Sequence, residues 1–88
     1  QNKEDSMTYK TKGTCSTLID IEMEPDQHTI KSVAFTGGCN GNLQGIGRLV
    51  EGMPVDEVIS RLRGIRCGMK PTSCPDQLAK ALRQALGQ

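Results

Sequence analysis

Four cysteines are the residues of this 88-residue chain best suited to chemistry: Cys15, Cys39, Cys67 and Cys74. Each has Gly, Ser or Asn within two residues, so all four are expected in loops or at helix entries rather than in apolar stripes. Four thiolates favour zinc or an iron–sulfur cluster. No C-x-x-C pair is present, so the spacing by itself indicates neither a zinc ribbon nor a thioredoxin-like motif.

The two metals imply different tasks, and a metal-free alternative stays open. Zinc held by four sulfurs has no open position for substrate water and would be structural, whereas a cluster would imply a carrier, scaffold or electron-transfer role. Without metal, Cys67 and Cys74 are the best candidates for a reversible disulfide, or the cysteines are merely structural. His28, the only histidine, stands in a predicted turn far from every cysteine, so we expect it to be solvated.

Cys74 begins the best-marked helix of the chain. Ser73 is a good N-cap, and Asp76 three residues later gives the polar half of a capping-box pattern. Pro75 is tolerated in the first helical turn, where its missing N–H costs nothing. A thiol at this position lies close to unpaired backbone N–H groups and to the positive end of the helix dipole. Both favour the thiolate, which is the form that reacts and binds metals.

Basic side chains gather before this helix, although the net charge is only +1. Arg61, Arg63, Arg66 and Lys70 could simply form a solvated helix end, or they could hold a thiolate cluster or a phosphate-bearing partner. The glycine-rich turn at residues 37–42 also precedes a helix, but it matches neither the dinucleotide fingerprint nor the Walker pattern. A phosphate- or nucleic-acid-binding module is therefore an alternative, with nucleic acid the less expected partner.

The elements that must position these side chains follow the order strands, then helices. Residues 19–23 alternate apolar and acidic side chains, as a half-buried strand does. Apolar residues recur at three- and four-residue steps in the second half, with Leu43, Ile46, Leu49 and Val50 expected on the inner side of the first helix. We predict an α+β fold with a small antiparallel three-stranded sheet and about three helices packed on one face. The predicted strands lie within residues 7–12, 19–23 and 29–36, and the predicted helices end near residues 50, 62 and 86.

A domain this small needs support beyond its core. Ten glycines and only two aromatic residues leave little apolar surface to bury, and a bound metal is one way to compensate. We expect a flexible tail at residues 1–7 and a single domain at 8–88. With no signal-peptide pattern and no membrane-length apolar run, we predict a cytoplasmic protein, where cysteines are more often ligands than disulfides. If it were secreted, three disulfide connectivities would be possible.

The run Thr72-Ser73-Cys74-Pro75-Asp76 resembles the signature of the TSCPD domain, in its small stand-alone four-cysteine form. Related domains are found at the C-terminus of some ribonucleotide reductases, notably cobalamin-dependent ones, where the cysteines are thought to bind metal or relay reducing equivalents. The resemblance implies a zinc or iron–sulfur site and an accessory link to ribonucleotide reduction. Nothing here resembles a catalytic barrel, so we expect no catalytic activity from the chain alone.

A more distant similarity is to the NifU/IscU iron–sulfur scaffold family, through the order of strand, Gly-Cys-Asn-Gly turn and helices. Three scaffold cysteines correspond to Cys15, Cys39 and Cys74. The scaffold Asp after the first cysteine is absent here, and Ser73 stands where that family has a His. The similarity implies the fold more than the scaffold activity, and Cys67 would complete a closed four-sulfur site.

Overall fold

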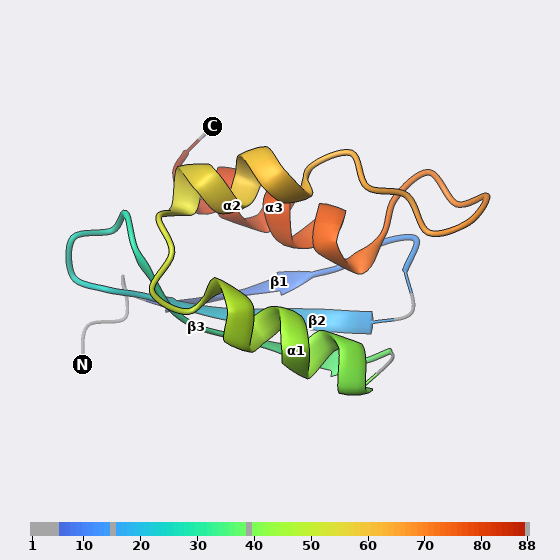
Figure 1. Cartoon of the computed structure of the whole chain (residues 1–88), viewed down its shortest axis with the longest axis horizontal. Coiled ribbons are helices and arrows are strands. Elements are labelled where there is room, and N and C mark those ends of the chain that lie inside the picture. Colours follow the sequence, from blue (N-terminus) through green and yellow to red (C-terminus); the bar gives the residue numbers. More distant parts are fainter. Residues whose placement is uncertain (1–5, 15, 39, 88) are drawn as a thin grey trace.

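A computed structural model describes residues 6–14, 16–38 and 40–87, and these form three strands followed by three helices (Figure 1). The α+β architecture expected from the sequence is confirmed. No helix in the described ranges is both long enough and apolar enough to cross a membrane. The elements are β1 (Ser6–Lys10), β2 (Ser16–Met23), β3 (Ile30–Gly37), α1 (Asn40–Val50), α2 (Val55–Leu62) and α3 (Cys74–Ala85).

The three strands form one antiparallel sheet in the order β1-β2-β3. Ile21 lies opposite Met7 on β1 and Val33 on β3, so one face of the sheet carries apolar side chains from all three strands. Asp20 lies on the other face, where its carboxylate accepts a hydrogen bond from the Thr8 hydroxyl at 2.6 Å. The first strand begins at Ser6, so the last two residues of the segment predicted as a tail belong to the sheet.

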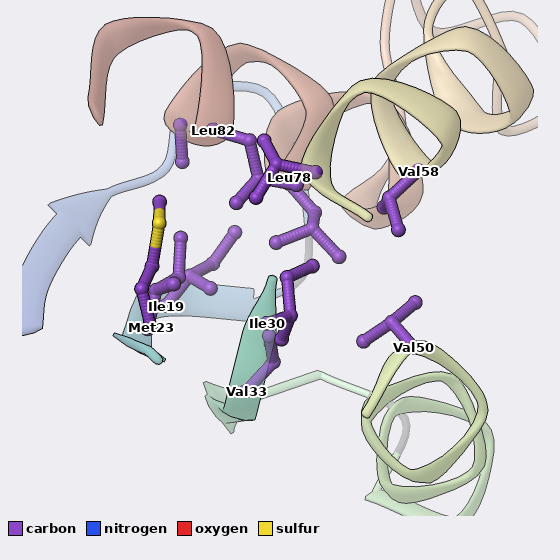
Figure 2. Packing of buried hydrophobic residues seen from close by; sticks show 11 residues of the cluster. Ile19, Met23, Ile30, Val33, Val50, Val58, Leu78 and Leu82 are labelled. Atoms are coloured by element: carbon purple, nitrogen blue, oxygen red, sulfur yellow. The ribbon is translucent and has the colours of Figure 1, made fainter. Parts of the chain in front are cut away.

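One apolar core joins the sheet to the helices (Figure 2). Leu78 and Leu82 of α3 point toward the apolar face of the sheet and are fully buried. The periodicity of residues 19–23 placed the strand side of this core correctly, because alternate side chains of a strand share one face. The buried cluster consists of Ile19, Ile21, Met23, Ile30, Val33, Val50, Val55, Val58, Leu78, Ala81 and Leu82.

The connection between α1 and α2 pairs with the beginning of β3. The Ile30 N–H donates to the Met53 carbonyl at 3.0 Å, and the Gly52 N–H donates to the Ile30 carbonyl at 2.8 Å. Gly52 has a φ of +82°, which glycine adopts without steric strain. These bonds anchor the C-terminal end of α1 at the edge of the sheet. They lie at the opposite end of the molecule from the start of α1 (Figure 1).

Leu49 is the one residue of the predicted inner side of α1 that the structure places outside the core. Its relative exposure is 76%, whereas Leu43 and Val50 are buried. Leu49 fits the helical spacing, but spacing cannot reveal whether a neighbouring element covers that side of the helix. In this fold the side facing α3 is left open, so the expectation for Leu49 was wrong.

Helix α1 approaches the backbone of β3 closely enough that only glycine fits at position 47. A Cβ at Gly47 would lie 2.6 Å from the Val33 carbonyl oxygen. Gly47→Ala should therefore push the helix away from the strand and lower the free energy of unfolding by about 1–2 kcal/mol, after a helix-propensity gain of up to about 1 kcal/mol. Urea denaturation measures the change.

Gly45→Ala is the matched control for Gly47→Ala, because the two glycines lie in the same helix. A Cβ at Gly45 would meet nothing within 4 Å. This variant should gain about 0.5–1 kcal/mol of stability from reduced unfolded-state entropy. Equal effects of the two substitutions would contradict the close approach at Gly47.

Candidate functional site

A cavity of about 470 Å³ opens between the beginning of α1, the α2–α3 loop and the beginning of α3. Two of the four predicted site residues, Cys67 and Cys74, line it. Lys70 is the charged residue among its described lining, and no carboxylate lines it within those residues. Its walls are mainly apolar and include the side chains of Leu43, Ile46, Leu49 and Pro75.

Cys67 and Cys74 reach this cavity from different settings. Cys74 is the first residue of α3 and is buried, whereas Cys67 is exposed in the α2–α3 loop. The Cys67 N–H donates to the Thr72 carbonyl at 3.1 Å, and the Cys67 carbonyl accepts from the Lys70 N–H at 3.0 Å. These bonds fold the loop back so that both cysteines face one cavity.

Cys15 and Cys39, the other two predicted ligands, lie outside the described residues. Thr14, which precedes Cys15 in the sequence, lines the cavity. Gly41, two residues after Cys39, lines it too. No group of three or more His, Cys, Asp or Glu side chains suitable for a metal occurs within residues 6–14, 16–38 and 40–87.

Ser73 links the beginning of α3 to the loop that carries Cys67. Its Oγ accepts the Asp76 N–H at 3.2 Å, which confirms the predicted N-cap, and donates to the Ile65 carbonyl at 2.6 Å. One hydroxyl thus satisfies an orphan N–H of the helix and fixes a residue two positions before Cys67.

Asp76 makes a second link to the same loop. Its buried carboxylate accepts the Gly64 N–H at 2.6 Å and the hydroxyl of Thr72. Lys80 Nζ lies 3.6 Å from Oδ2, one helical turn further on. Burial raises the pKa of Asp76, but the hydrogen bonds from Thr72 and Gly64 and the charge of Lys80 outweigh it, so the pKa lies below the ordinary value.

Gln77 connects α3 to the β1–β2 loop. Its Nε2 donates to Thr72 Oγ1 at 3.0 Å, and its Oε1 accepts the Lys12 N–H at 3.1 Å. Gly13 lies against the same threonine, because a Cβ at this glycine would come within 3.1 Å of Thr72 Cγ2. Both the loop before Cys15 and the loop containing Cys67 are therefore attached to the first turn of α3.

Sequence reasoning identified Asp76 only as part of a local cap and did not single out Gln77. A signal was present: Thr72, Asp76 and Gln77 are polar residues within or beside the apolar stripe of α3, and all three are buried. Buried polar side chains require partners. What the sequence could not give was the identity of those partners, which lie in distant loops.

Comparison with known protein families gives a match that includes this helix entry. The model of the family described as TSCPD domain matches residues 2–86, which is nearly the whole chain. The chain belongs to the TSCPD domain family. No curated protein and no solved structure matches it, so the similarity to the NifU/IscU fold stays a prediction.

The four basic residues predicted as a possible anion site belong to α2 and the α2–α3 loop of the TSCPD domain. Lys70 lines the cavity, whereas Arg63 and Arg66 are exposed elsewhere in the loop. The exposed Arg61 pairs with Glu57, with Nη2 and Oε2 2.7 Å apart. His28 is exposed in the β2–β3 turn, at the far end of the molecule from this loop (Figure 1).

The lowered pKa of Asp76 gives the domain an acid-dependent stability. A carboxylate with a folded pKa below its ordinary value of 3.8 stabilises the fold above that value and loses this contribution as the pH falls through the folded pKa. The difference in unfolding free energy between wild type and Asp76→Asn should thus be largest at neutral pH and shrink as the pH falls below 3.8. Urea denaturation of metal-free protein at several pH values measures it. A difference that does not change with pH would contradict the assignment.

Proposed function

We propose that Cys15, Cys39, Cys67 and Cys74 bind one metal centre, zinc in the first instance and an iron–sulfur cluster as the alternative. The observation that carries this proposal is the shared cavity: Cys67 and Cys74 line it, and so do Thr14 and Gly41, chain neighbours of the other two cysteines. Four segments that each contain a cysteine therefore contribute to the walls of one cavity.

The chemistry of the lining fits a soft metal. Thiolate ligands select zinc and iron–sulfur iron, whereas magnesium and calcium prefer the carboxylates that the described lining lacks. Cys74 stands at a helix N-terminus, where the dipole favours its thiolate. The apolar walls would limit the access of water to the sulfurs. Four sulfur ligands would make zinc a structural element that joins four loops, with no catalytic activity of its own.

Elemental analysis and an absorption spectrum of anaerobically purified protein test the proposal. Zinc predicts about one equivalent per chain and no visible colour, whereas a cluster predicts iron, sulfide and a visible absorption band. Single Cys→Ser variants at the four positions should each reduce metal content, and Ser60→Ala, an exposed change in α2, should not. Metal-free protein that fails to take up zinc or iron at equimolar concentration would overturn the proposal.

A thiol redox role is the second candidate, and the hydrogen bond between the Cys67 N–H and Thr72 favours it by turning Cys67 back toward Cys74. The pair would cycle between dithiol and disulfide in the service of a partner, such as a ribonucleotide reductase, because some of these enzymes carry a related domain at their C-terminus. Alkylation mapping in glutathione buffers tests this role. A thiol state that is constant across cytosolic potentials would exclude it, and metal binding would be unaffected by that result.

A further inference from the structure

The end of the molecule that contains the cavity is depleted in acidic residues. Residues 6–19, 27–50 and 61–75 contain no Asp or Glu, and these ranges supply every segment that lines the cavity. Residues 61–75 carry four cationic side chains instead. The exposed carboxylates of the described chain come from β2, the β2–β3 turn, the end of α1 and the first turn of α2. The segments that line the cavity are therefore basic, although the net charge of the chain is only +1.

The large hydrophobic side chains that are exposed in the described residues belong to two elements that line the cavity, α1 and the α2–α3 loop. Leu49, with 76% exposure, lines it from α1. Ile65 and Met69, with 41% and 102% exposure, flank Cys67 in the α2–α3 loop. This loop extends beyond the helices at one end of the molecule (Figure 1). Apolar side chains gathered on one exposed face are typical of an interaction site.

We propose that Ile65, Met69, Arg63, Arg66 and Lys70 of the α2–α3 loop form one basic apolar face with Leu49 of α1, and that this face docks an acidic segment of a partner protein whose apolar side chain packs against Leu49 at the opening of the cavity. Leu49 is suited to this contact because it lines the cavity and is itself 76% exposed. Carboxylates of the segment would pair with the arginines and the lysine. Residues 61–75 contain no Asp or Glu that would compete for these cations. This inference goes beyond the proposed metal site and does not depend on it.

The composition of the face favours a protein segment over nucleic acid. Proteins that bind single-stranded nucleic acid combine cations with exposed aromatic side chains for base stacking. The aromatic residues of this chain are Tyr9 and Phe35, and both pack against the core of the domain. Aliphatic side chains beside cations are instead suited to an amphipathic acidic peptide. Two copies of the chain that met through this face would repel each other, because the face is basic in both.

Peptide display with purified, metal-loaded protein tests the proposal. We expect a random dodecapeptide library to become enriched in sequences that combine Asp or Glu with Leu, Ile or Phe. Fluorescence anisotropy then measures the affinity of a selected peptide. The double variant Arg66→Glu/Lys70→Glu and the single variant Met69→Asp should each weaken binding roughly tenfold or more, and added salt should weaken binding to the wild type. Lys31→Glu, an exposed change on β3, is the matched control and should have little effect.

Several results would overturn the proposal. Selected peptides without acidic residues, or equal affinity for the wild type and the double variant, would exclude this face as an acidic-segment site. Tighter binding of a single-stranded oligonucleotide than of any selected peptide would assign the face to nucleic acid. Concentration-dependent dimerisation abolished by Met69→Asp would assign it to a second copy. Circular dichroism of each variant ensures that a loss of binding does not come from unfolding.

Discussion

Asp76→Ala is expected to lower the free energy of unfolding by about 3–5 kcal/mol, because it removes two hydrogen bonds to a buried charge, each worth about 1.5–3 kcal/mol. The carboxylate accepts from the Gly64 N–H and from the hydroxyl of Thr72, so the substitution leaves both donors without this partner. Urea denaturation monitored by circular dichroism measures the loss. Asp76→Asn keeps the shape and one acceptor, and should fall between alanine and wild type.

The same substitution should release the α2–α3 loop in particular. Asp76 and Ser73 attach this loop to α3 through Gly64 and Ile65, and removing one attachment should raise the hydrogen-exchange rate of the Cys67 amide. Asp26→Ala is the matched control, because Asp26 also accepts backbone N–H groups, from His28 at 2.8 Å, but in an exposed turn at the other end of the molecule. A control that destabilises the domain as much as Asp76→Ala would refute a special role for the buried carboxylate.

The fold was largely predictable because its core follows local patterns. Alternation in residues 19–23 identified the buried side of β2, and Ser73 identified the first turn of α3 through the chemistry of helix capping. Leu49 escaped prediction because a helical stripe shows which side chains share a face, whereas burial requires a second element on that face. No second element covers Leu49, and this depends on the tertiary structure rather than on the local sequence. The same uncovered side of α1 forms part of the cavity wall.

The candidate site was predictable only in its residue types. Four cysteines beside small polar residues suggested a shared centre, and the structure brings Cys67 and Cys74 to one cavity. The polar side chains that hold the surrounding loops were harder to anticipate. Gln77 joins Thr72 to Lys12 across 65 residues of sequence, and no local pattern encodes a contact of that separation. Long-range polar contacts of this kind depend on the complete fold.

If the proposed metal site is occupied, removing the metal is expected to change the stability of this domain about as much as Asp76→Ala does. A ligand present at about a thousand times its dissociation constant stabilises the folded state by about 4 kcal/mol. For a domain of this size that corresponds to a fall in Tm of roughly 16–32 °C after chelation. Thermal unfolding followed by circular dichroism, with and without a chelator, measures the shift.

The structure also indicates how that loss should be distributed. The buried cluster between α3 and the sheet does not include a cysteine from the described residues, so its packing does not itself require metal. The loops around the cavity, by contrast, are joined to α3 by a few polar contacts from Ser73, Asp76 and Gln77. Chelation should therefore raise hydrogen exchange first in the loops and only later in the strands. Cys67→Ser, which should already lack metal, would show no further shift with chelator, and an equal shift in this variant would mean that the chelator acts elsewhere.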